Sequence, residues 1–199
     1  MFLEDIKAIL RTRPMLRRYG GELTGWKFAV YVPIMVVFNP GVLAVGLYRL
    51  SSSFCGLPFP ARWFGLFFDR LNTLLTGVQL PASAKIGPGL IIMHPQAVIL
   101  APNLDAGKNL CVVGPSVTIG WQDVDGEPDE QFVNVGDDVI VGAGAKVLGP
   151  LTVGDRVKIG PNSMLTEDAP DDSTVISAAR TKVISLAPAA EPEPAQKPS

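Results

Sequence analysis

The stretch that decides the fold runs from Val135 to Met164 and reads VGDDVI, VGAGAK, VLGPLT, VGDRVK, IGPNSM. An aliphatic residue opens each of these five units, and glycine follows it in four of them. A helix would repeat near 3.6 residues and a simple strand at 2, so a period of six indicates neither. Short units of fixed length stack because one unit cannot bury its own apolar face, and hexapeptide repeats are typical of a parallel β-helix.

The period also predicts how each unit is built. We expect one short strand and one corner per unit, with the aliphatic residue pointing inward onto its equivalents in neighbouring coils. The glycine permits tight backbone geometry at the corner. Burying one valine or isoleucine contributes about 1.5–3 kcal/mol, so a stack in register forms a substantial core. The chain is therefore expected to be mainly β. The five stacked residues are Val135, Val141, Val147, Val153 and Ile159.

A second, looser block of the same repeat precedes the first. Its members also fall every six residues and are Ile86, Ile92, Val98, Leu104 and Leu110. The acidic segment 121–132 (WQDVDGEPDEQF) breaks the period, so we expect a loop ejected from the column there. Such a loop either carries function or is a solvated connection. The predicted β-helix domain spans residues 78–183, and the part after Met164 should cover its open end.

Residues 1–77 are predicted to form an N-terminal α-helical segment. The uncharged run 28–48 has the length of a membrane-spanning helix, but Pro33 and the Asn39-Pro40-Gly41 triplet break it. We expect two short buried helices joined by a turn near Asn39, with an interfacial hairpin at a membrane surface as the alternative.

Two further helices are expected in this segment. Residues 5–16 form a short amphipathic helix whose basic face is either solvated or set on an anionic membrane. Residues 62–75 carry aromatic residues and leucines spaced for one face, which should pack against the neighbouring helices.

Composition excludes several classes of function. The chain has 199 residues and a net charge of −2, so no basic excess favours nucleic-acid binding. One histidine and two cysteines without metal-ligand spacing predict no metal site, and reduced thiols fit a cytoplasmic protein. Charged residues soon after Met1 do not match a signal peptide. The segment 184–199, rich in Pro, Ala and Glu, is expected to be a disordered tail.

Three stretches together resemble the serine O-acetyltransferase group of hexapeptide acyltransferases. They are AKIGPGLIIMH (84–94), VGAGAKVLGPLTVGDRVKIGPNS (141–163) and FNPGVLAVGLYRL (38–50). The resemblance runs from about Asn39 to Val183 and implies a left-handed parallel β-helix, an acyl-CoA donor and a homotrimer with active sites between neighbouring columns. The chain also resembles the shorter acetyltransferases of exopolysaccharide clusters, such as those of colanic acid synthesis.

The resemblance assigns the catalytic base to His94, the only histidine in the chain. A neutral imidazole near pH 7 can take the proton of a hydroxyl acceptor, and such help is typically worth about 10²–10⁴ in rate. The alternative is a structural histidine at a coil corner. Gln79 stands where the serine enzymes carry an aspartate that orients the histidine. Glutamine can accept a hydrogen bond from the imidazole but cannot offset its charge.

Three further departures concern the acceptor. Phe132 lies close to the place of the family's second active-site histidine, Trp26 near its serine-gripping acid, and Met93 replaces the aspartate before the histidine. These changes favour acetyl transfer to a hydroxyl of a sugar or glycan precursor, in polysaccharide biosynthesis. The alternatives are a serine O-acetyltransferase of cysteine biosynthesis and a non-catalytic trimeric scaffold.

The resemblance places the donor, acetyl-CoA, along residues 141–163. Ala143 and Gly144 are small, so the backbone can approach the pantetheine arm. Lys158 matches a position near the nucleotide phosphates, with a solvated surface lysine as the alternative. Pro161 begins a Pro-Asn pair where the family usually has Ala-Gly. The expected partners are a small-molecule or glycan acceptor and two further copies of the chain, with membrane-surface association through residues 28–48 at the inner face of the cell membrane.

Overall fold

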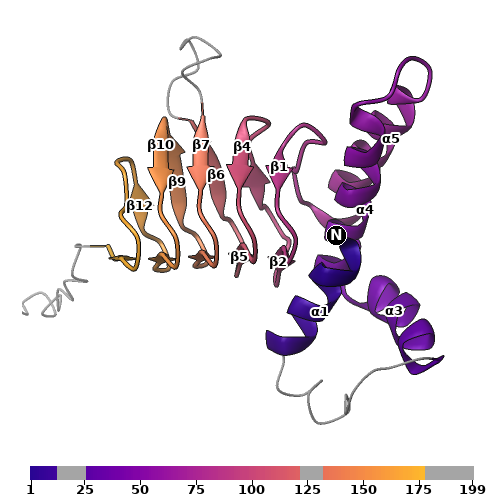
Figure 1. Ribbon diagram of the computed structural model, residues 1–199, viewed down its shortest axis with the longest axis horizontal. Helices are drawn as coiled ribbons and strands as arrows, with labels where there is room; N and C mark the ends of the chain where they lie inside the picture. Colours follow the sequence, from indigo (N-terminus) through magenta and orange to yellow (C-terminus); the bar gives the residue numbers. More distant parts are fainter. Residues whose placement is uncertain (13–25, 122–131, 178–199) are drawn as a thin grey trace, which may run out of the picture.

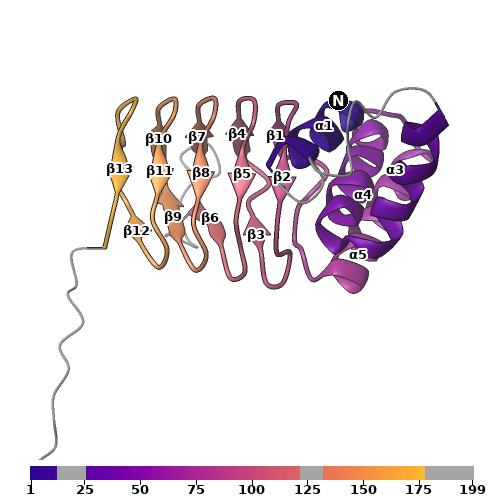
Figure 2. The same cartoon turned by 90° about the horizontal axis from the view of Figure 1, so that it is seen from below.

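The computed structural model describes residues 1–12, 26–121 and 132–177. A group of helices lies at one end of a long column of strands (Figures 1 and 2). The helices are α1 (Phe2–Thr12), α3 (Trp26–Phe38), α4 (Pro40–Cys55) and α5 (Arg62–Thr76). The predicted tail 184–199 and most of the predicted ejected loop lie outside the described residues.

The column is a three-sided parallel β-helix. Its β1 face is made of β1 (Lys85–Ile86), β4 (Leu104–Ala106), β7 (Val133–Val135) and β10 (Leu151–Val153). Its β2 face is made of β2 (Ile91–Ile92), β5 (Cys111–Val112), β8 (Ile140–Val141), β11 (Lys158–Ile159) and β13 (Thr174–Val175). Its β3 face is made of β3 (Ile99–Leu100), β6 (Thr118–Trp121), β9 (Lys146–Gly149) and β12 (Met164–Leu165). From β1 to β12, successive strands lie on successive faces, so the chain winds around the core.

The strict repeat stacks as predicted. Val135 pairs with Val153 on the β1 face, Val141 with Ile159 on the β2 face, and Val147 with Leu165 on the β3 face. All these side chains are buried in one continuous core. The stacking of equivalent aliphatic residues at six-residue spacing is therefore confirmed.

The looser block is out of the predicted register. Val98, Leu104 and Leu110 are buried, but they do not continue the stack that begins with Ile86 and Ile92. The stack continues instead at Leu100, Ala106 and Val112. Eight residues separate Ile92 from Leu100 instead of six, because the corner between the β2 and β3 faces is two residues longer in this coil.

Aspartates bind the coils to each other at the corner between the β1 and β2 faces. Asp137 accepts a hydrogen bond from the Lys108 amide at 2.7 Å, and Asp155 accepts one from the Asp137 amide at 2.7 Å. Asp171 accepts one from the Asp155 amide at 2.9 Å. The glycine before each corner is needed, since a Cβ added at Gly136 would collide with the Asp155 carboxylate. The Val-Gly-Asp pattern therefore encodes a ladder of carboxylates.

The segment after β12 continues this column. Ala169 pairs with Val153 on the β1 face, and β13 pairs with β11 on the β2 face. We expected a separate closing segment here. Through residue 177 the chain adds further rungs of the same kind.

The turn near Asn39 is confirmed. Asn39 caps α4, with its side-chain oxygen accepting hydrogen bonds from the amides of Gly41 and Val42 at 3.1 and 3.3 Å. Gly41 is required because a Cβ there would collide with the Ile92 carbonyl, so α4 lies directly on β2. No single helix in the described ranges is long and apolar enough to cross a membrane; Val32–Phe38 and Pro40–Cys55 meet that test only together, bent by 106°.

The expectation that both helices of the 28–48 run are buried is wrong for the end of α3. In α3, Met35 is buried, but Ile34, Val37 and Phe38 are exposed. The buried residues of α4 include Val42, Val45 and Tyr48, which pack on the first coil. The apolar run is therefore divided between one helix in the core and one whose end faces outward.

The expected packing of the third helix is confirmed only in part. The helix exists as α5, and the rings of Phe64 and Phe68 lie 5.9 and 6.1 Å from the ring of Phe54 in α4, whereas Phe67 is exposed. The side against α4 is formed by Gly65, Asn72 and Thr76, where the Asn72 amide donates to the Ala44 carbonyl at 3.1 Å. Small and polar residues allow the two helices to approach closely, and this leaves the apolar side outward.

The amphipathic helix expected over residues 5–16 is present as α1, with Lys7 exposed on its solvated side. It begins at Phe2, and Asp5, Ile6 and Ile9 are buried. The Asp5 carboxylate is fully buried and accepts hydrogen bonds from the amides of Gly89 and Leu90 at 2.7 and 2.9 Å. A buried charge is costly unless it is paired, and this one is paired with Arg49.

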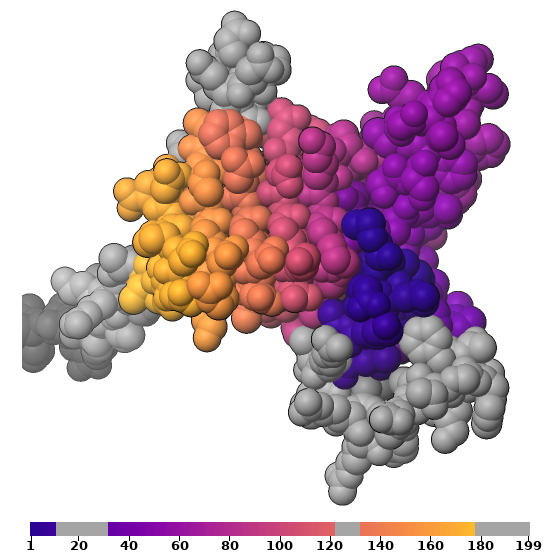
Figure 3. Space-filling view, viewed as in Figure 1, coloured from indigo at the N-terminus to yellow at the C-terminus, as the bar shows by residue number. Residues whose placement is uncertain are grey.

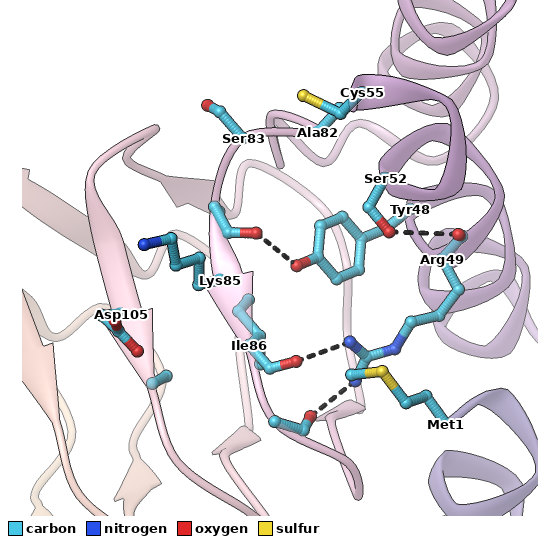
Figure 4. A pocket seen from close by; sticks show the side chains of 13 residues that line it. Met1, Tyr48, Arg49, Ser52, Cys55, Ala82, Ser83, Lys85, Ile86 and Asp105 are labelled. Atoms are coloured by element: carbon cyan, nitrogen blue, oxygen red, sulfur yellow. Dashed lines mark hydrogen bonds between the residues drawn. The ribbon is translucent and has the colours of Figure 1, made fainter. Parts of the chain in front are cut away.

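Arg49 completes the attachment of the helices to the first coil. Its guanidinium contacts Asp5 at 2.8 Å and donates to the carbonyls of Ile86 and Gly87, both at 2.6 Å (Figure 4). The Tyr48 hydroxyl donates to the Ala84 carbonyl at 2.7 Å. Burial raises the pKa of this phenol, so it stays a neutral donor at ordinary pH.

We expect Asp5→Ala to lower the free energy of unfolding by about 3–5 kcal/mol, because it leaves a buried guanidinium without its partner. Urea denaturation of the full chain measures this change. The control is Lys7→Ala, which removes an ion pair to Glu4 whose side chains are 53% and 54% exposed and should cost less than about 1 kcal/mol. Equal losses in the two variants would contradict the role given to Asp5.

Candidate active site

Four of the six predicted site residues lie along one edge of the column, where the chain turns from the β2 face to the β3 face, and the other two lie on the adjoining faces. We call this the β2–β3 edge; it comprises residues 93–98, 113–117, 142–145 and 160–163 of four successive coils. Backbone hydrogen bonds join the corners from Ser116 to Gln96 at 3.0 Å, from Gly144 to Pro115 at 2.9 Å and from Asn162 to Ala143 at 2.9 Å. The four corners therefore form one continuous strip.

His94 lies in the first corner of this edge, on the outside of the column, with its side chain exposed. The longer corner after Ile92 places it in a loop rather than on a strand. The backbone there is held against the next coil, since a Cβ at Gly114 would collide with the His94 carbonyl. Gly114 also has a φ of +48°, which favours glycine. A solute at this edge can reach the imidazole from solvent.

Gln79 lies next to the same corner but does not bond to His94 through its side chain. Its amide donates to the Val98 carbonyl at 2.9 Å, and its carbonyl accepts from the Leu100 amide at 2.8 Å. The residue thus adds one rung to the β3 face ahead of Ile99, and its side chain is exposed. Neither side chain has a hydrogen bond to the other among the described residues. That Gln79 orients the imidazole stays a prediction.

Lys146, the first residue of β9 beside this edge, is a residue that sequence reasoning missed. Its amine donates to the Ser116 carbonyl at 2.6 Å and to the Thr118 hydroxyl at 2.9 Å. It thereby braces the corner that stacks directly on the His94 corner. In a six-residue repeat, the position of Lys146 is one of those that face outward and vary. Its partner strand, β6, precedes the interruption at 122–131, whereas Lys146 follows it. The register that joins Lys146 to Thr118 could not be read from spacing.

The residues expected to hold the donor occupy the third and fourth corners. Ala143 is half-buried and Pro161 is exposed. Gly144 has a φ of +72°, and a Cβ there would collide with the Asn162 side chain, so coil stacking alone already requires this glycine. Strands in a sheet are about 4.8 Å apart, which places the Ala143 corner about 10 Å from the His94 corner.

Lys158 lies beside these corners on the adjoining face. It is exposed on β11, between Ile140 and Thr174 of the neighbouring coils. The structure therefore brings the four expected donor residues to one end of the edge and His94 to the other. This is the arrangement needed for a long donor that lies along the strip with its reactive end at the imidazole.

Among the residues that the structure describes, other reactive groups do not form a second centre. Burial raises the pKa of the Cys111 thiol, so this residue is a poor nucleophile. Within the described ranges, no three His, Cys, Asp or Glu side chains are grouped in a way that could hold a metal ion. The cavity of about 510 Å³ shown in Figure 4 lies away from the edge, between α4 and the β1 face, and Arg49 and Lys85 are among its lining residues.

Comparisons with known proteins agree with this architecture. Residues 132–167 match the family model described as bacterial transferase hexapeptide (six repeats). The chain is 33% identical over 143 residues to a serine acetyltransferase of Helicobacter pylori, covering 71% of this chain and 80% of that protein. This identity extends well beyond the repeat itself.

Two solved structures are similar in fold. A serine acetyltransferase of Neisseria gonorrhoeae superposes with a TM-score of 0.73 at 23% identity, covering 94% of this chain and 65% of that one. A serine acetyltransferase in complex with CoA gives a TM-score of 0.69 at 22% identity, covering 87% of this chain and 64% of that one. The chain thus spans just under two thirds of each solved chain. The predicted fold class, a left-handed parallel β-helix with N-terminal helices, is confirmed.

The bracing role of Lys146 can be tested by hydrogen exchange. Lys146→Met removes both hydrogen bonds to the second corner, so we expect the amides of residues 113–118 to exchange several-fold faster. Lys108→Met, an exposed lysine at the opposite corner, is the control and should leave this peptide unchanged. Equal exchange in the two variants would show that the corner does not depend on the amine.

Proposed function

This chain belongs to the hexapeptide-repeat acyltransferases of the serine O-acetyltransferase-like group, and on that premise we propose its acceptor, the roles of its residues and its assembly. It is an O-acetyltransferase, and its co-substrate is acetyl-CoA. The observation that carries the proposal is the exposed His94 on an edge whose other end gathers the residues expected at the donor.

L-serine is the acceptor that we place first. The sequence alone favoured a sugar or glycan precursor, with serine as the alternative. The relatives reverse that order, because proteins named serine acetyltransferase match over most of their length, 80% in Helicobacter pylori and 73% in Bacillus pumilus. Exopolysaccharide chemistry has no comparable support among these relatives.

A sugar hydroxyl remains the second candidate because of three residues. Met93, Phe132 and Gln79 stand where the resemblance puts polar groups of the serine enzymes. Phe132 is 38% exposed just before the chain re-enters the column at β7, and an aromatic surface suits the face of a sugar ring. This candidate and serine differ in a measurable way, which the acceptor screen below uses.

The proposed chemistry follows from the position of His94. The imidazole takes the proton of the acceptor hydroxyl, and the oxygen forms a bond to the thioester carbonyl carbon of acetyl-CoA. Collapse of the tetrahedral intermediate breaks the carbon–sulfur bond, and the leaving thiolate takes the proton back from the imidazolium. Gln79 is proposed to accept a hydrogen bond that holds the imidazole in one tautomer.

The donor is proposed to lie along the second half of the edge. Ala143 and Gly144 offer a narrow backbone against which an extended pantetheine arm can lie. Lys158 would face the nucleotide phosphates, and Pro161 would form the rim near the adenine end. A non-catalytic scaffold would have no use for this alignment of an imidazole with a donor strip.

The active assembly is proposed to be a homotrimer, because the edge is an open strip in one chain and needs a second wall. Exposed apolar residues on the adjoining faces, Ile99, Ile140 and Met164, are suited to contact a neighbouring column. Membrane-surface association through residues 28–48, at the inner face of the cell membrane, stays part of the proposal. The exposed end of α3 supports it.

We expect His94→Ala to lower the rate of acetyl transfer by about 10²–10⁴ while leaving thermal unfolding unchanged, because the side chain is exposed. Release of CoA thiol, followed with a thiol reagent, measures the rate. Gln96→Ala changes an exposed residue of the same corner and serves as the control. Gln79→Ala should fall between the two. A His94→Ala enzyme with the wild-type rate would remove the proposed base.

An acceptor screen decides between the two hydroxyl classes. With acetyl-CoA present, millimolar L-serine should raise thiol release well above background, whereas L-alanine, which lacks only the hydroxyl, should not. Monosaccharides and nucleotide sugars are run in parallel. A sugar that outperforms serine by about tenfold or more in kcat/KM would reverse the order proposed here. If the protein binds acetyl-CoA but transfers the acetyl group to none of these acceptors, the non-catalytic scaffold would be favoured over both transferase candidates.

A further inference from the structure

Helix α5 is an amphipathic helix whose apolar side faces away from the protein. Its buried residues, Gly65, Asn72 and Thr76, are small or polar. Six of its eight large apolar side chains are exposed, and Phe68 and Leu71 are half-buried. The exposed six are Trp63, Phe64, Leu66, Phe67, Leu74 and Leu75. A helix on the surface of a globular protein normally has the reverse arrangement, with apolar residues facing the core. This side is therefore suited to contact an apolar medium or partner.

The exposed apolar surface is made of large side chains from α5 and the turn before it. Leu74 is 80% exposed and Trp63 is 63% exposed, and Phe59 in the preceding turn is 79% exposed. Figure 3 shows α5 projecting from the column at its helical end, with the outer side clear of the strands. Contiguous exposed apolar patches of this kind mark sites of protein or membrane contact.

The charges beside this surface are positive. Arg62 and Arg70 are exposed on the same helix. Asp69, the acidic residue of α5, is half-buried near Arg70, and with Arg62 it lines a hollow beside Pro81 and Ala82, so the arginines leave the helix with one net positive charge. Amphipathic helices that lie in the interface of an anionic bilayer are typically rich in tryptophan, phenylalanine and leucine on one side, with arginine or lysine beside them.

A two-fold pair of chains, with α5 packed on α5, fits this surface less well. A symmetric pair would bring the same patch against itself, so the arginines of one helix would face those of the other. Anionic lipid headgroups would instead neutralise both arginines while the acyl region receives the aromatic rings. The apolar end of α3, with Val37 and Phe38 exposed, lies at the same end of the molecule (Figure 1).

We propose that the outer side of α5, together with the turn before it, binds the surface of an anionic lipid bilayer, with the helix lying in the interface. This surface is distinct from the 28–48 run, whose second half is packed on the first coil. It is also independent of the transfer chemistry, because the β2–β3 edge and α5 share no residue.

The test is co-sedimentation of the full chain with vesicles. We expect binding to vesicles of phosphatidylcholine and phosphatidylglycerol at 7:3, and weaker binding to phosphatidylcholine alone. Phe67→Glu combined with Leu74→Glu should lower the bound fraction about tenfold or more, since charge is placed in the apolar contact. Ile176→Glu, which changes an isoleucine 74% exposed on the column, is the matched control and should bind as the wild type does. Arg62→Gln with Arg70→Gln should remove the preference for phosphatidylglycerol.

A second measurement does not depend on the folding of a charged variant. Brominated lipids should quench part of the tryptophan fluorescence of the wild type, and Trp63→Phe should abolish that part. The proposal is overturned if the wild type binds no vesicles, or if the double glutamate variant binds equally well. It is also overturned if that variant instead lowers the mass of the assembly in light scattering, because a second copy would then cover the helix.

Discussion

The structure depends on one constraint: each coil must present its inward side chains at the same height as those of the coils on either side. Val141 can stack on Ile159 only if the backbone pairs between these residues keep their parallel register. Residues that do not fit the six-residue count cannot be absorbed in the strands, because a shift of one position would turn the core outward. They can be accommodated only at corners, and the longer corner that carries His94 is one such place.

The first coil has no coil beneath it, and the helices supply what is missing. Within the column, the Asn109 amide at the corner between the β1 and β2 faces donates to the Pro88 carbonyl of the coil before it. At the start of the column, Asp5 of α1 takes this part for the amides of Gly89 and Leu90. Arg49 of α4 satisfies the facing carbonyls of Ile86 and Gly87 and neutralises the carboxylate. The helical end is thus joined to the core by a buried ion pair that supplies the hydrogen-bond partners a preceding coil would have offered.

Sequence patterns predicted those parts of the fold that are specified locally. The Val-Gly units between Val135 and Met164 predicted their own strands and core, because each unit meets a near-identical neighbour. The same arithmetic failed after Ile92, since spacing does not reveal how many residues a corner holds. Periodicity also showed that α5 has an apolar face, but not that Gly65 and Asn72 would form the packed side. The candidate site follows the same division, with His94 found by resemblance and Lys146 found only from the register across the interrupted coil.

The continuous edge places the corners of successive coils at regular intervals along the column. Its rungs are about 4.8 Å apart, so the interval between the imidazole and the corners at Ala143 and Pro161 changes only in whole steps. A donor that lies along this strip must match an integral count of rungs. Inserting or deleting one coil between these corners would therefore change the length of the donor molecule that fits between them. The residues at either end of the strip would stay the same.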